Sequence, residues 1–170
     1  MITIDTGKKG GAISFAGAGL IKSTFLFEIS NDIFLNINEF YEWLLEQNDN
    51  EVIIERIPLV PHGNVKSIAE QNFHVGCIYA TVYLALEAVG LELTEYYPVQ
   101  WQSGVLRVHN RLKVIHQSQI DTPKRKVEAV AQYYFPKLCK EHTKRIRVND
   151  AISDCLGLYI YANLDSYFIE

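Results

Sequence analysis

Two short apolar segments joined by a glycine-rich turn at the start of the chain limit the fold more than any other feature of the sequence. Ile2–Asp5 alternates β-branched residues and ends in an acid, and Ala12–Phe15 is mostly apolar. Gly7 and Gly10 give the backbone freedom for a tight return, so the pattern predicts two antiparallel strands. Asp5 either initiates the turn or is held at the edge of the sheet to bind metal or phosphate. This segment alone leaves both interpretations open.

Three further segments extend the predicted sheet. Leu20–Glu28 is rich in β-branched and aromatic residues and predicts a third strand of an antiparallel meander. Val52–Glu55 is continuously apolar up to its final acid, which suits a buried parallel strand, and Leu91–Tyr97 resumes strand character. The sequence therefore predicts an α/β fold whose five-stranded mixed sheet, a three-strand antiparallel meander plus two parallel strands, is flanked by helices.

Helical patterns lie between and after these strands. Val65–Val89 predicts one long helix with a broad apolar face, and Gly90 is placed to end it. Gly76 and Ala80 on this helix would let another backbone approach, and we favour core packing over a contact with a second chain. Three more helices are predicted: one capped by Asn36 or Asn38 that runs through Gln47, one capped by Thr122 that begins at Pro123 and closes at Tyr134–Pro136, and one from near Asn149 to about Asn163.

Length and composition favour one globular domain over residues 1–170. Hydrophobic residues make up 48% of the 170 residues, enough for a sizeable core. The longest apolar stretch, Cys77–Leu86, is far shorter than the roughly 20 residues of a membrane-spanning helix, and no cleavable leader pattern opens the sequence. The three cysteines are far apart without a CxxC pair, which argues against a disulfide framework or a zinc site. We expect a soluble cytoplasmic protein with no membrane partner.

The charge is distributed unevenly along the chain. The net charge of −4 separates into −8 for residues 1–106, +8 for residues 107–147 and −4 for residues 148–170. A basic segment between acidic ones predicts a polyanion-binding face beside a carboxylate cluster, although a solvated lysine-rich surface would look the same. Residues 101–114 are expected to form a loop or short helix with exposed charge, and residues 137–148 a basic connection.

Two aspartates open the last predicted helix. Asp150 and Asp154 are four residues apart, so both lie on one face of the helix and repel each other. Acids in a first turn also favour the helix dipole, but the following Cys155–Ala162 is apolar almost all round, so the helix is mostly buried. Together with Asp5 and Glu55, they make four carboxylates that can converge.

Oxygen ligands of this kind suit Mg²⁺, with Mn²⁺ able to substitute. Two such ions can promote phosphodiester hydrolysis by in-line displacement. With the basic segment alongside, the sequence predicts hydrolysis of nucleic acid.

The order of the four acids along the chain, with the segments around them, resembles the pattern of a known family. Asp5 in its meander, the strand ending Ile54–Glu55, the long helix around Gly76 and the segment Asp150–Tyr159 are similar to the RuvC-type Holliday-junction resolvases of the RNase H-like superfamily. The resemblance covers nearly the whole chain. Within that family, the chain resembles the phage and poxvirus branch most. The segments that carry this closer resemblance are Pro98 with Trp101–Gly104, Lys124–Lys126 with Ala129, and Phe135–Pro136.

The resemblance implies a homodimeric crossover junction endonuclease of DNA recombination and repair, which binds a four-way DNA junction and nicks two strands symmetrically. A phage-encoded member would act in the cytoplasm of its bacterial host. Asp5, Glu55, Asp150 and Asp154 match the metal ligands of the family. Lys124, or else Lys126, falls near a basic residue that bacterial members place close to the scissile phosphate.

Two departures from the bacterial pattern concern DNA contacts. The lysine that bacterial members carry near Gln102 is absent, so that contact would come from Arg107. Three residues after the catalytic glutamate, bacterial members carry an aromatic residue that acts at the junction centre. In this chain that position holds Pro58, followed by Leu59, and Phe73 is the candidate to take over the role of the aromatic residue. The residues expected to contact DNA are Lys8, Lys9, Phe73, Arg107, Arg111, Lys113, Lys124, Arg125 and Lys126.

Other functions remain open at this point. A flap or broader branched-DNA nuclease and an RNA–DNA hybrid nuclease belong to the same superfamily, and a non-catalytic DNA-binding or assembly module is an alternative of another class. Asp5-Thr6-Gly7 also resembles the phosphate loop of actin-like ATPases and sugar kinases. Those proteins need two such domains around a nucleotide cleft, for which 170 residues leave no room.

Overall fold

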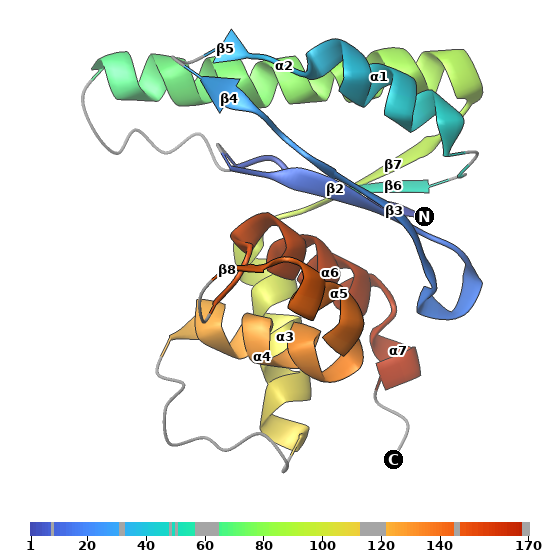
Figure 1. Ribbon diagram of the computed structural model, residues 1–170, viewed down its shortest axis with the longest axis vertical. Helices are drawn as coiled ribbons and strands as arrows, with labels where there is room; N and C mark the ends of the chain where they lie inside the picture. The colour runs from blue at the N-terminus through green and yellow to red at the C-terminus, as the bar shows by residue number, and fades with distance from the viewer. Residues whose placement is uncertain are drawn as a thin grey trace.

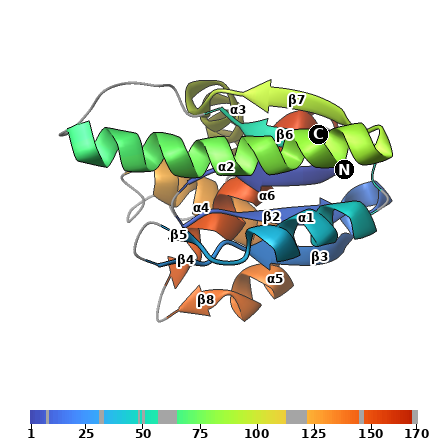
Figure 2. The ribbon, with the colours of Figure 1, turned by 90° about the horizontal axis from the view of Figure 1, so that it is seen from above.

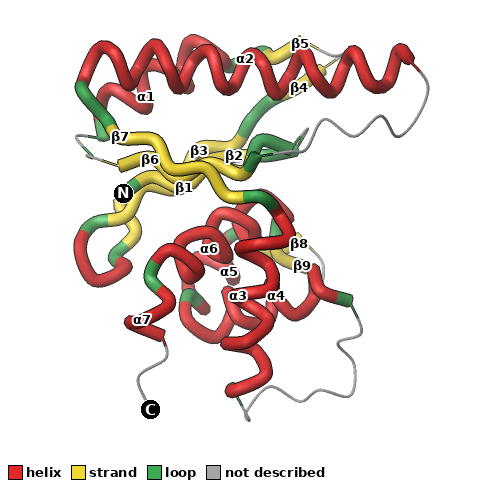
Figure 3. Tube along the Cα trace, turned by 180° about the vertical axis from the view of Figure 1, so that it is seen from behind, coloured by secondary structure: helices red, strands yellow, loops and turns green. Residues whose placement is uncertain are grey.

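The computed structural model describes residues 1–7, 9–30, 33–47, 49, 51–56, 65–112, 122–144 and 147–167. The chain forms three layers: a central sheet, a pair of helices on one face and a group of helices on the other (Figure 1). Figure 3 shows the same layers from behind. This is the α/β architecture that the sequence predicts.

The central sheet has five strands in the order β3-β2-β1-β6-β7. Its strands are β1 (Ile2–Asp5), β2 (Gly11–Phe15), β3 (Ile21–Leu26), β6 (Glu51–Glu55) and β7 (Glu92–Tyr96). β2 is antiparallel to both β1 and β3, whereas β6 is parallel to both β1 and β7. The predicted meander with two parallel strands is confirmed. Because β1, β6 and β7 run in the same direction, their carboxyl ends meet at one edge of the sheet.

The helices divide between the two faces of the sheet. The long α2 crosses one face beside the shorter α1, as seen from above in Figure 2. In the parts of the chain that the structure describes, no helix has the length and apolarity to cross a membrane. The helices are α1 (Ile37–Glu46) and α2 (Val65–Val89) on one face, and α3 (Pro98–Arg111), α4 (Pro123–Tyr134), α5 (Pro136–Glu141), α6 (Asp150–Ala162) and α7 (Leu164–Tyr167) on the other. The short elements are a 3₁₀ turn at Gly17–Gly19, the ladder of β4 (Ile29–Ser30) with β5 (Ile33–Phe34), and the ladder of β8 (Thr143–Lys144) with β9 (Arg147–Val148).

The alternation of side chains along the strands decides which layer each residue faces. Ile4 and Ile54 are fully buried in the cluster that includes α1 and α2 residues. Ile53 is buried in the cluster formed with α3, α4 and α6. Since successive strand residues point to opposite faces, Asp5 and Glu55 point toward the α3–α6 layer.

Local capping signals correctly predict where several helices begin. Asn36 stands at the start of α1, but its side chain accepts the Glu28 N–H instead of capping the helix. Helix α2 spans the predicted residues 65–89. The Thr122 hydroxyl accepts the Arg125 backbone N–H at the start of α4. The Asn149 side chain accepts the Ala151 N–H at the start of α6, at 3.0 Å. These caps satisfy N–H groups that lack a partner within the helix.

Two predictions in the basic half of the chain are wrong. Residues 98–111 form a regular helix rather than a loop or short helix, because Trp101, Val105 and Val108 recur at helical spacing and are all buried. Gly104 does not break the helix: it packs directly against the Tyr161 ring. Residues 137–148 are likewise more ordered than a basic connection, since they include most of α5 and the β8–β9 ladder.

The preferred interpretation of the small residues on α2 is also wrong. Gly76 and Ala80 are exposed to solvent rather than packed in the core. A Cβ added at Gly76 would meet no atom within 4 Å. The side of α2 that carries them faces away from the sheet.

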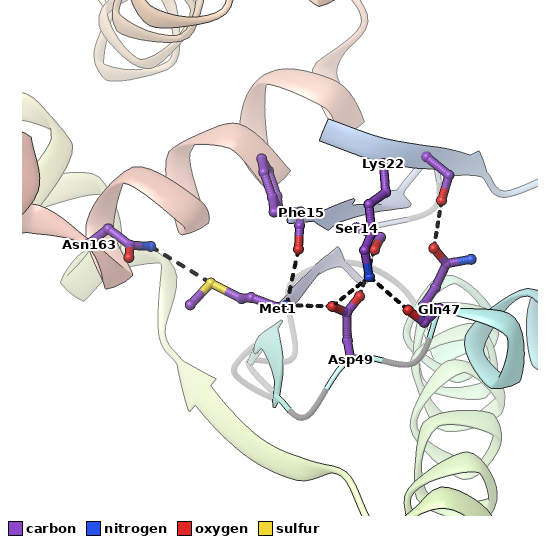
Figure 4. Close-up of polar contacts among 8 residues, drawn as sticks. Met1, Ser14, Phe15, Lys22, Gln47, Asp49 and Asn163 are labelled. Carbon is purple, nitrogen blue, oxygen red and sulfur yellow. Dashed lines mark hydrogen bonds and ion pairs between the residues drawn. The ribbon is translucent and has the colours of Figure 1, made fainter. Parts of the chain in front are cut away.

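A buried carboxylate, Asp49, joins three segments at the end of the sheet where β1 begins (Figure 4). Its Oδ1 pairs with the Met1 α-amino group at 2.8 Å and with Lys22 Nζ at 3.1 Å, and its Oδ2 accepts the Ser14 hydroxyl at 2.6 Å. Although burial opposes ionisation, these three partners hold the pKa of Asp49 below its usual value. Through Asp49, which precedes β6, the network links the N-terminus with β2 and β3.

Candidate active site

Asp5 and Glu55 end neighbouring parallel strands and lie beside each other at the carboxyl edge of the sheet. The register of β1 on β6 pairs Ile4 with Ile54, so the acids that follow occupy matching positions. Both residues are buried, with exposed fractions of 6% and 7%. A hydrogen bond links the two carboxyl groups, which therefore titrate as a pair.

Asp5 initiates the turn after β1, the first of the two roles that the sequence leaves open. The Gly7 N–H donates to Asp5 Oδ1 at 2.9 Å, so the aspartate initiates the turn. A side chain at Gly10 would overlap the Asp5 carbonyl oxygen, which is why the return needs glycine. The Thr6 hydroxyl donates to the Glu55 carbonyl oxygen at 3.0 Å and ties the turn to β6. Asp5 is thus a turn residue whose carboxyl group also faces Glu55.

Helix α6 brings the other two predicted acids to the same edge. Asp154 lies one turn into the helix and interacts electrostatically with Asp5 and Glu55. Asp150, in the first turn, is about half exposed and forms an ion pair with Lys124 of α4, with 2.9 Å between Oδ2 and Nζ. Asp5 and Glu55 are therefore buried, Asp154 is half-buried beside them, and Asp150 is more exposed still.

Burial and mutual repulsion change the acidity of this group. Burial, followed by the negative charges of Asp5 and Asp154, raises the pKa of Glu55 to about 8. Burial and the charge of Asp5 raise the pKa of Asp154 to about 7. Burial also raises the pKa of Asp5, although the Gly7 N–H acts in the opposite direction. Without a neutralising cation, the group retains protons near neutral pH.

Lys124 supplies a positive charge beside the acids. Burial lowers its pKa, but the hydrogen bond to Asp150 and the charges of Asp154 and Asp5 outweigh burial, and the pKa lies above its usual value. The lysine therefore stays protonated next to the carboxylates. Lys126, the other basic residue considered from the sequence, is half-buried on the same helix and has no such contact described.

Two residues that support the acids carry no functional assignment from the sequence. Trp101, fully buried on α3, donates its indole N–H to Glu55 Oε1 at 3.3 Å. Glu128 on α4 accepts the Val148 backbone N–H at 2.9 Å, just before α6 begins. A buried tryptophan needs a partner for its N–H, which is a signal that could have led to Trp101, whereas nothing local points to Glu128.

The donor set is that of a hard divalent cation, since it consists of carboxylate oxygens alone. In the described ranges, however, no group of three or more His, Cys, Asp or Glu side chains has the arrangement of a metal site. Lys124 pairs with Asp150, and the pKa values of Glu55 and Asp154 are raised, so a cation would compete with the lysine and with protons for these oxygen atoms. The residues fit a cation in chemistry, and binding one would release Lys124 and those protons.

The predicted DNA contacts fall on several elements. Lys124 and Arg125 are exposed in the first turn of α4 beside the acids, and Arg107 and Arg111 are exposed on α3. Lys9 is exposed in the turn after β1. Phe73 is 61% exposed on α2, in the opposite layer from α6. Lys8, Lys113, Pro58 and Leu59 lie outside the described residues.

A cavity of about 490 Å³ lies elsewhere, between β3 and the α4–α5 corner. It is lined by Lys22, Tyr134 and His142 among others, and by none of the four acids. This cavity is therefore separate from the candidate site.

Comparison with known proteins identifies the fold. The sequence matches no protein-family model, and no curated protein gives a significant match. Among solved structures, the chain is similar to Thermus thermophilus RuvC in complex with a Holliday junction substrate, with a TM-score of 0.61, 14% identity, and coverage of 98% of this chain and 95% of that one. It is also similar to a further Thermus thermophilus RuvC structure, with a TM-score of 0.58, 17% identity, and 97% of each chain covered. The chain has a RuvC-like fold. Neither comparison supports the predicted closeness to the phage and poxvirus branch.

The raised pKa values predict that the metal-free protein loses stability as the pH rises from about 4 to about 8. A carboxyl group whose pKa is higher in the folded than in the unfolded chain stabilises the fold below its unfolded value, near 4, and this contribution is lost as the pH rises through the folded value. For Asp154 and Glu55 the loss therefore begins near pH 4 and is complete a little above the folded pKa values of about 7 and 8. We expect the Tm in EDTA to fall by several degrees over this range, since about 1 kcal/mol shifts the Tm of a chain of this size by roughly 2–4 °C.

The matched variants are Asp154→Asn, which should flatten the pH dependence and raise the Tm at pH 8.5, and Asp165→Asn, an exposed acid on α7 that should leave the profile unchanged. A wild-type Tm that is constant or rising between pH 5 and 8 would show that these carboxyl groups are not protonated in the folded protein.

Proposed function

We propose that this chain is a divalent-metal-dependent endonuclease that resolves four-way DNA junctions by paired, symmetric nicking. The observation that carries the proposal is the group formed by Asp5, Glu55 and Asp154, three acids from three separate elements that share one edge of a RuvC-like sheet with Lys124 beside them. One similar structure is that of a RuvC bound to a Holliday junction substrate, which favours branched DNA over other nucleic acids. We assign the activity to residues 1–170 as one nuclease domain.

In this proposal Asp5, Glu55, Asp150 and Asp154 hold Mg²⁺, with Mn²⁺ able to substitute and two ions expected. When bound, the ions activate the attacking water and stabilise the leaving oxygen of the phosphodiester. Trp101 orients the Glu55 carboxyl group through its indole N–H, and the Gly7 N–H fixes that of Asp5.

Lys124 has two partners in the proposed reaction. In the free protein it pairs with Asp150, at 2.9 Å. Its ammonium group is about half exposed on the first turn of α4, where it can turn to a DNA phosphate once Asp150 is engaged elsewhere. Arg125, Lys126, Arg107, Arg111 and Lys9 extend the positive surface and neutralise backbone phosphates, so binding should weaken with salt.

The exposed side of α2 supports a homodimer, which paired nicking requires because each strand needs its own active site. Phe73, Gly76, Ala80 and Tyr83 follow one another at spacings of three and four residues, and Leu84 extends the stripe. Phe73, Tyr83 and Leu84 are 61%, 51% and 59% exposed, which is unusual for large apolar side chains on a monomer. The small residues at the centre would let the α2 helices of two copies approach closely across a twofold axis.

Cleavage of synthetic DNA tests the nuclease assignment. With Mg²⁺ or Mn²⁺, the wild type should nick two opposing strands of a labelled four-way junction at symmetric positions on a denaturing gel. Asp5→Asn should still bind the junction, but its cleavage rate should fall by more than roughly 100-fold. Loss of a residue that only supports a metal ligand costs up to about that factor, and Asp5 is proposed as a direct ligand. Asp165→Asn, an exposed acid away from the site, should cleave like the wild type.

The same gels include a flap, a linear duplex and an RNA–DNA hybrid. If the protein cleaves the flap or the hybrid in preference to the junction, its activity is that of a flap nuclease or a hybrid nuclease and not junction resolution. Full activity of Asp5→Asn, or no cleavage of any substrate by the wild type, would contradict the nuclease assignment itself.

A substitution that introduces one charged side chain on the exposed stripe of α2 tests the dimer. Ala80→Arg places a cation at the centre of the exposed stripe without disturbing the core, so sedimentation should change from dimer to monomer with little change in Tm. Gln132→Arg, an equally exposed position on α4, is the control and should remain dimeric. A monomeric wild type, or an Ala80→Arg variant that stays dimeric, would rule out this interface.

A further inference from the structure

The two acids that end β1 and β6 each have one carboxylate oxygen already bound to an N–H group of the protein. Asp5 Oδ1 accepts the Gly7 backbone N–H at 2.9 Å, and Glu55 Oε1 accepts the indole N–H of Trp101 at 3.3 Å. Both acids are buried, so water competes little for these two bonds. Each acid therefore keeps one oxygen, Oδ2 of Asp5 and Oε2 of Glu55, that neither N–H group occupies.

The Trp101 ring has little freedom to move away from Glu55. The side chain is fully buried in the apolar cluster that α3, α4 and α6 form with Ile53. A Cβ added at Gly157 of α6 would lie 2.6 Å from the Trp101 ring, so the indole lies directly against the backbone of that helix. Because Gly157 follows Asp154 by one turn, the ring is a fixed spacer between the acid of β6 and the acids of α6.

The other tryptophan of the chain, Trp43, uses its indole differently. It lies on α1, in the opposite layer, where its ring packs against Phe25 and Phe40. In the part of the chain that the structure describes, its Nε1 has no hydrogen-bond partner. Trp43 is thus held by ring packing, whereas Trp101 is packed in the same way and also donates its N–H to an acid of the candidate site. The pair offers a matched comparison.

The number of oxygens that a carboxylate can offer affects which divalent cation it favours. Ca²⁺ takes roughly six to eight oxygen ligands at about 2.3–2.6 Å and often both oxygens of one carboxylate. Mg²⁺ needs a near-octahedral arrangement at about 2.0–2.1 Å and keeps several waters, so one oxygen from each carboxylate is enough. An oxygen that already accepts an N–H bond is a poorer ligand for a cation. Asp5 and Glu55 are therefore better suited to the smaller ion.

We propose that Trp101 is a positioning residue that makes Glu55 bind a cation through one oxygen, and that it thereby gives the site a preference for Mg²⁺ and Mn²⁺ over Ca²⁺. The Gly7 N–H acts on Asp5 in the same way. This inference rests on the proposed function and deepens it, because it names the group that sets the cation specificity of the same acids. A Trp101 that only filled the core would affect the binding of all three cations alike.

Competition between cations measures this preference without any cleavage step. Free Mn²⁺ is read from its electron paramagnetic resonance signal while Mg²⁺ or Ca²⁺ displaces the bound ion, which gives a Kd for each cation. Trp101→Phe keeps an apolar ring but lacks the N–H, so its affinity for Mg²⁺ should fall about 10- to 100-fold, as when other groups that support a metal ligand are lost. Its affinity for Ca²⁺ should change far less, because Glu55 can then offer both oxygens. The ratio of the Ca²⁺ Kd to the Mg²⁺ Kd should therefore drop by about 10-fold or more.

Two further proteins separate the N–H group from the shape of the ring. Trp43→Phe should keep the wild-type ratio of the two Kd values. In this Trp43→Phe protein the remaining tryptophan, Trp101, can be replaced during expression by 3-benzothienylalanine, which has sulfur in place of the N–H and a ring of similar size. That protein should show the reduced ratio of Trp101→Phe. Because its core stays filled, it takes the place of Trp101→Phe if the phenylalanine variant fails to fold.

Nuclear magnetic resonance of the indole N–H follows the contact itself. In Trp43→Phe protein labelled with ¹⁵N, Trp101 gives the only indole signal, and Mg²⁺ should shift it because Glu55 binds the cation with its other oxygen. In Trp101→Phe the signal of Trp43 should not move when Mg²⁺ is added. A Trp101 signal that stays in place while Mg²⁺ binds would contradict the proposed role of the indole.

The two proposals fail in different ways. A wild type that binds Mn²⁺ at the acids, with a Kd ratio that is unchanged or raised in Trp101→Phe and in the sulfur analogue, would overturn the role of Trp101 and leave the nuclease assignment intact. A wild type that binds neither Mn²⁺ nor Mg²⁺, or whose Mn²⁺ affinity is the same in Asp5→Asn, would overturn both.

Discussion

The parallel pairing of β1 with β6 is the interaction on which the candidate site depends. Once Ile4 lies opposite Ile54, the next residues, Asp5 and Glu55, must lie side by side with their carboxyl groups buried. Two buried acids at this separation cannot both be ionised at low cost, so the fold must supply protons or positive charge. The free protein uses both, since Glu55 has a pKa of about 8 and Lys124 lies alongside.

The remaining elements hold this unfavourable cluster together. α6 packs on β1 and β2 through Ile152 and Leu156, and its cap at Asn149 fixes where Asp150 and Asp154 lie. Glu128 joins α4 to the segment before α6, and so links the helix that carries Lys124 to the helix that carries the two aspartates. The apolar core therefore provides the free energy that keeps like charges close together, which is the usual state of a site that binds cations.

The elements and the acids could be predicted from the sequence because their signals are local, as with the alternation ending in Asp5 or the cap at Thr122. The expected loop or short helix is a regular 14-residue helix, α3, because Gly104 and the basic residues obscure the helical spacing of Trp101, Val105 and Val108 in the sequence. The contacts of Trp101 with Glu55 join residues far apart in the sequence, so only tertiary packing reveals them. The exposure of Gly76 follows from which side of α2 meets the sheet, and a helix apolar nearly all round does not indicate that side.

A crystal soaked in Mn²⁺ at pH 8 and measured at the manganese absorption edge tests the central claim most directly. The account predicts anomalous density among the carboxyl groups of Asp5, Glu55 and Asp154, with Lys124 withdrawn from Asp150. Soaking Asp5→Asn crystals in the same way should remove or weaken that density. Wild-type crystals with no anomalous density at this edge of the sheet, and with the Lys124–Asp150 pair intact, would contradict the account.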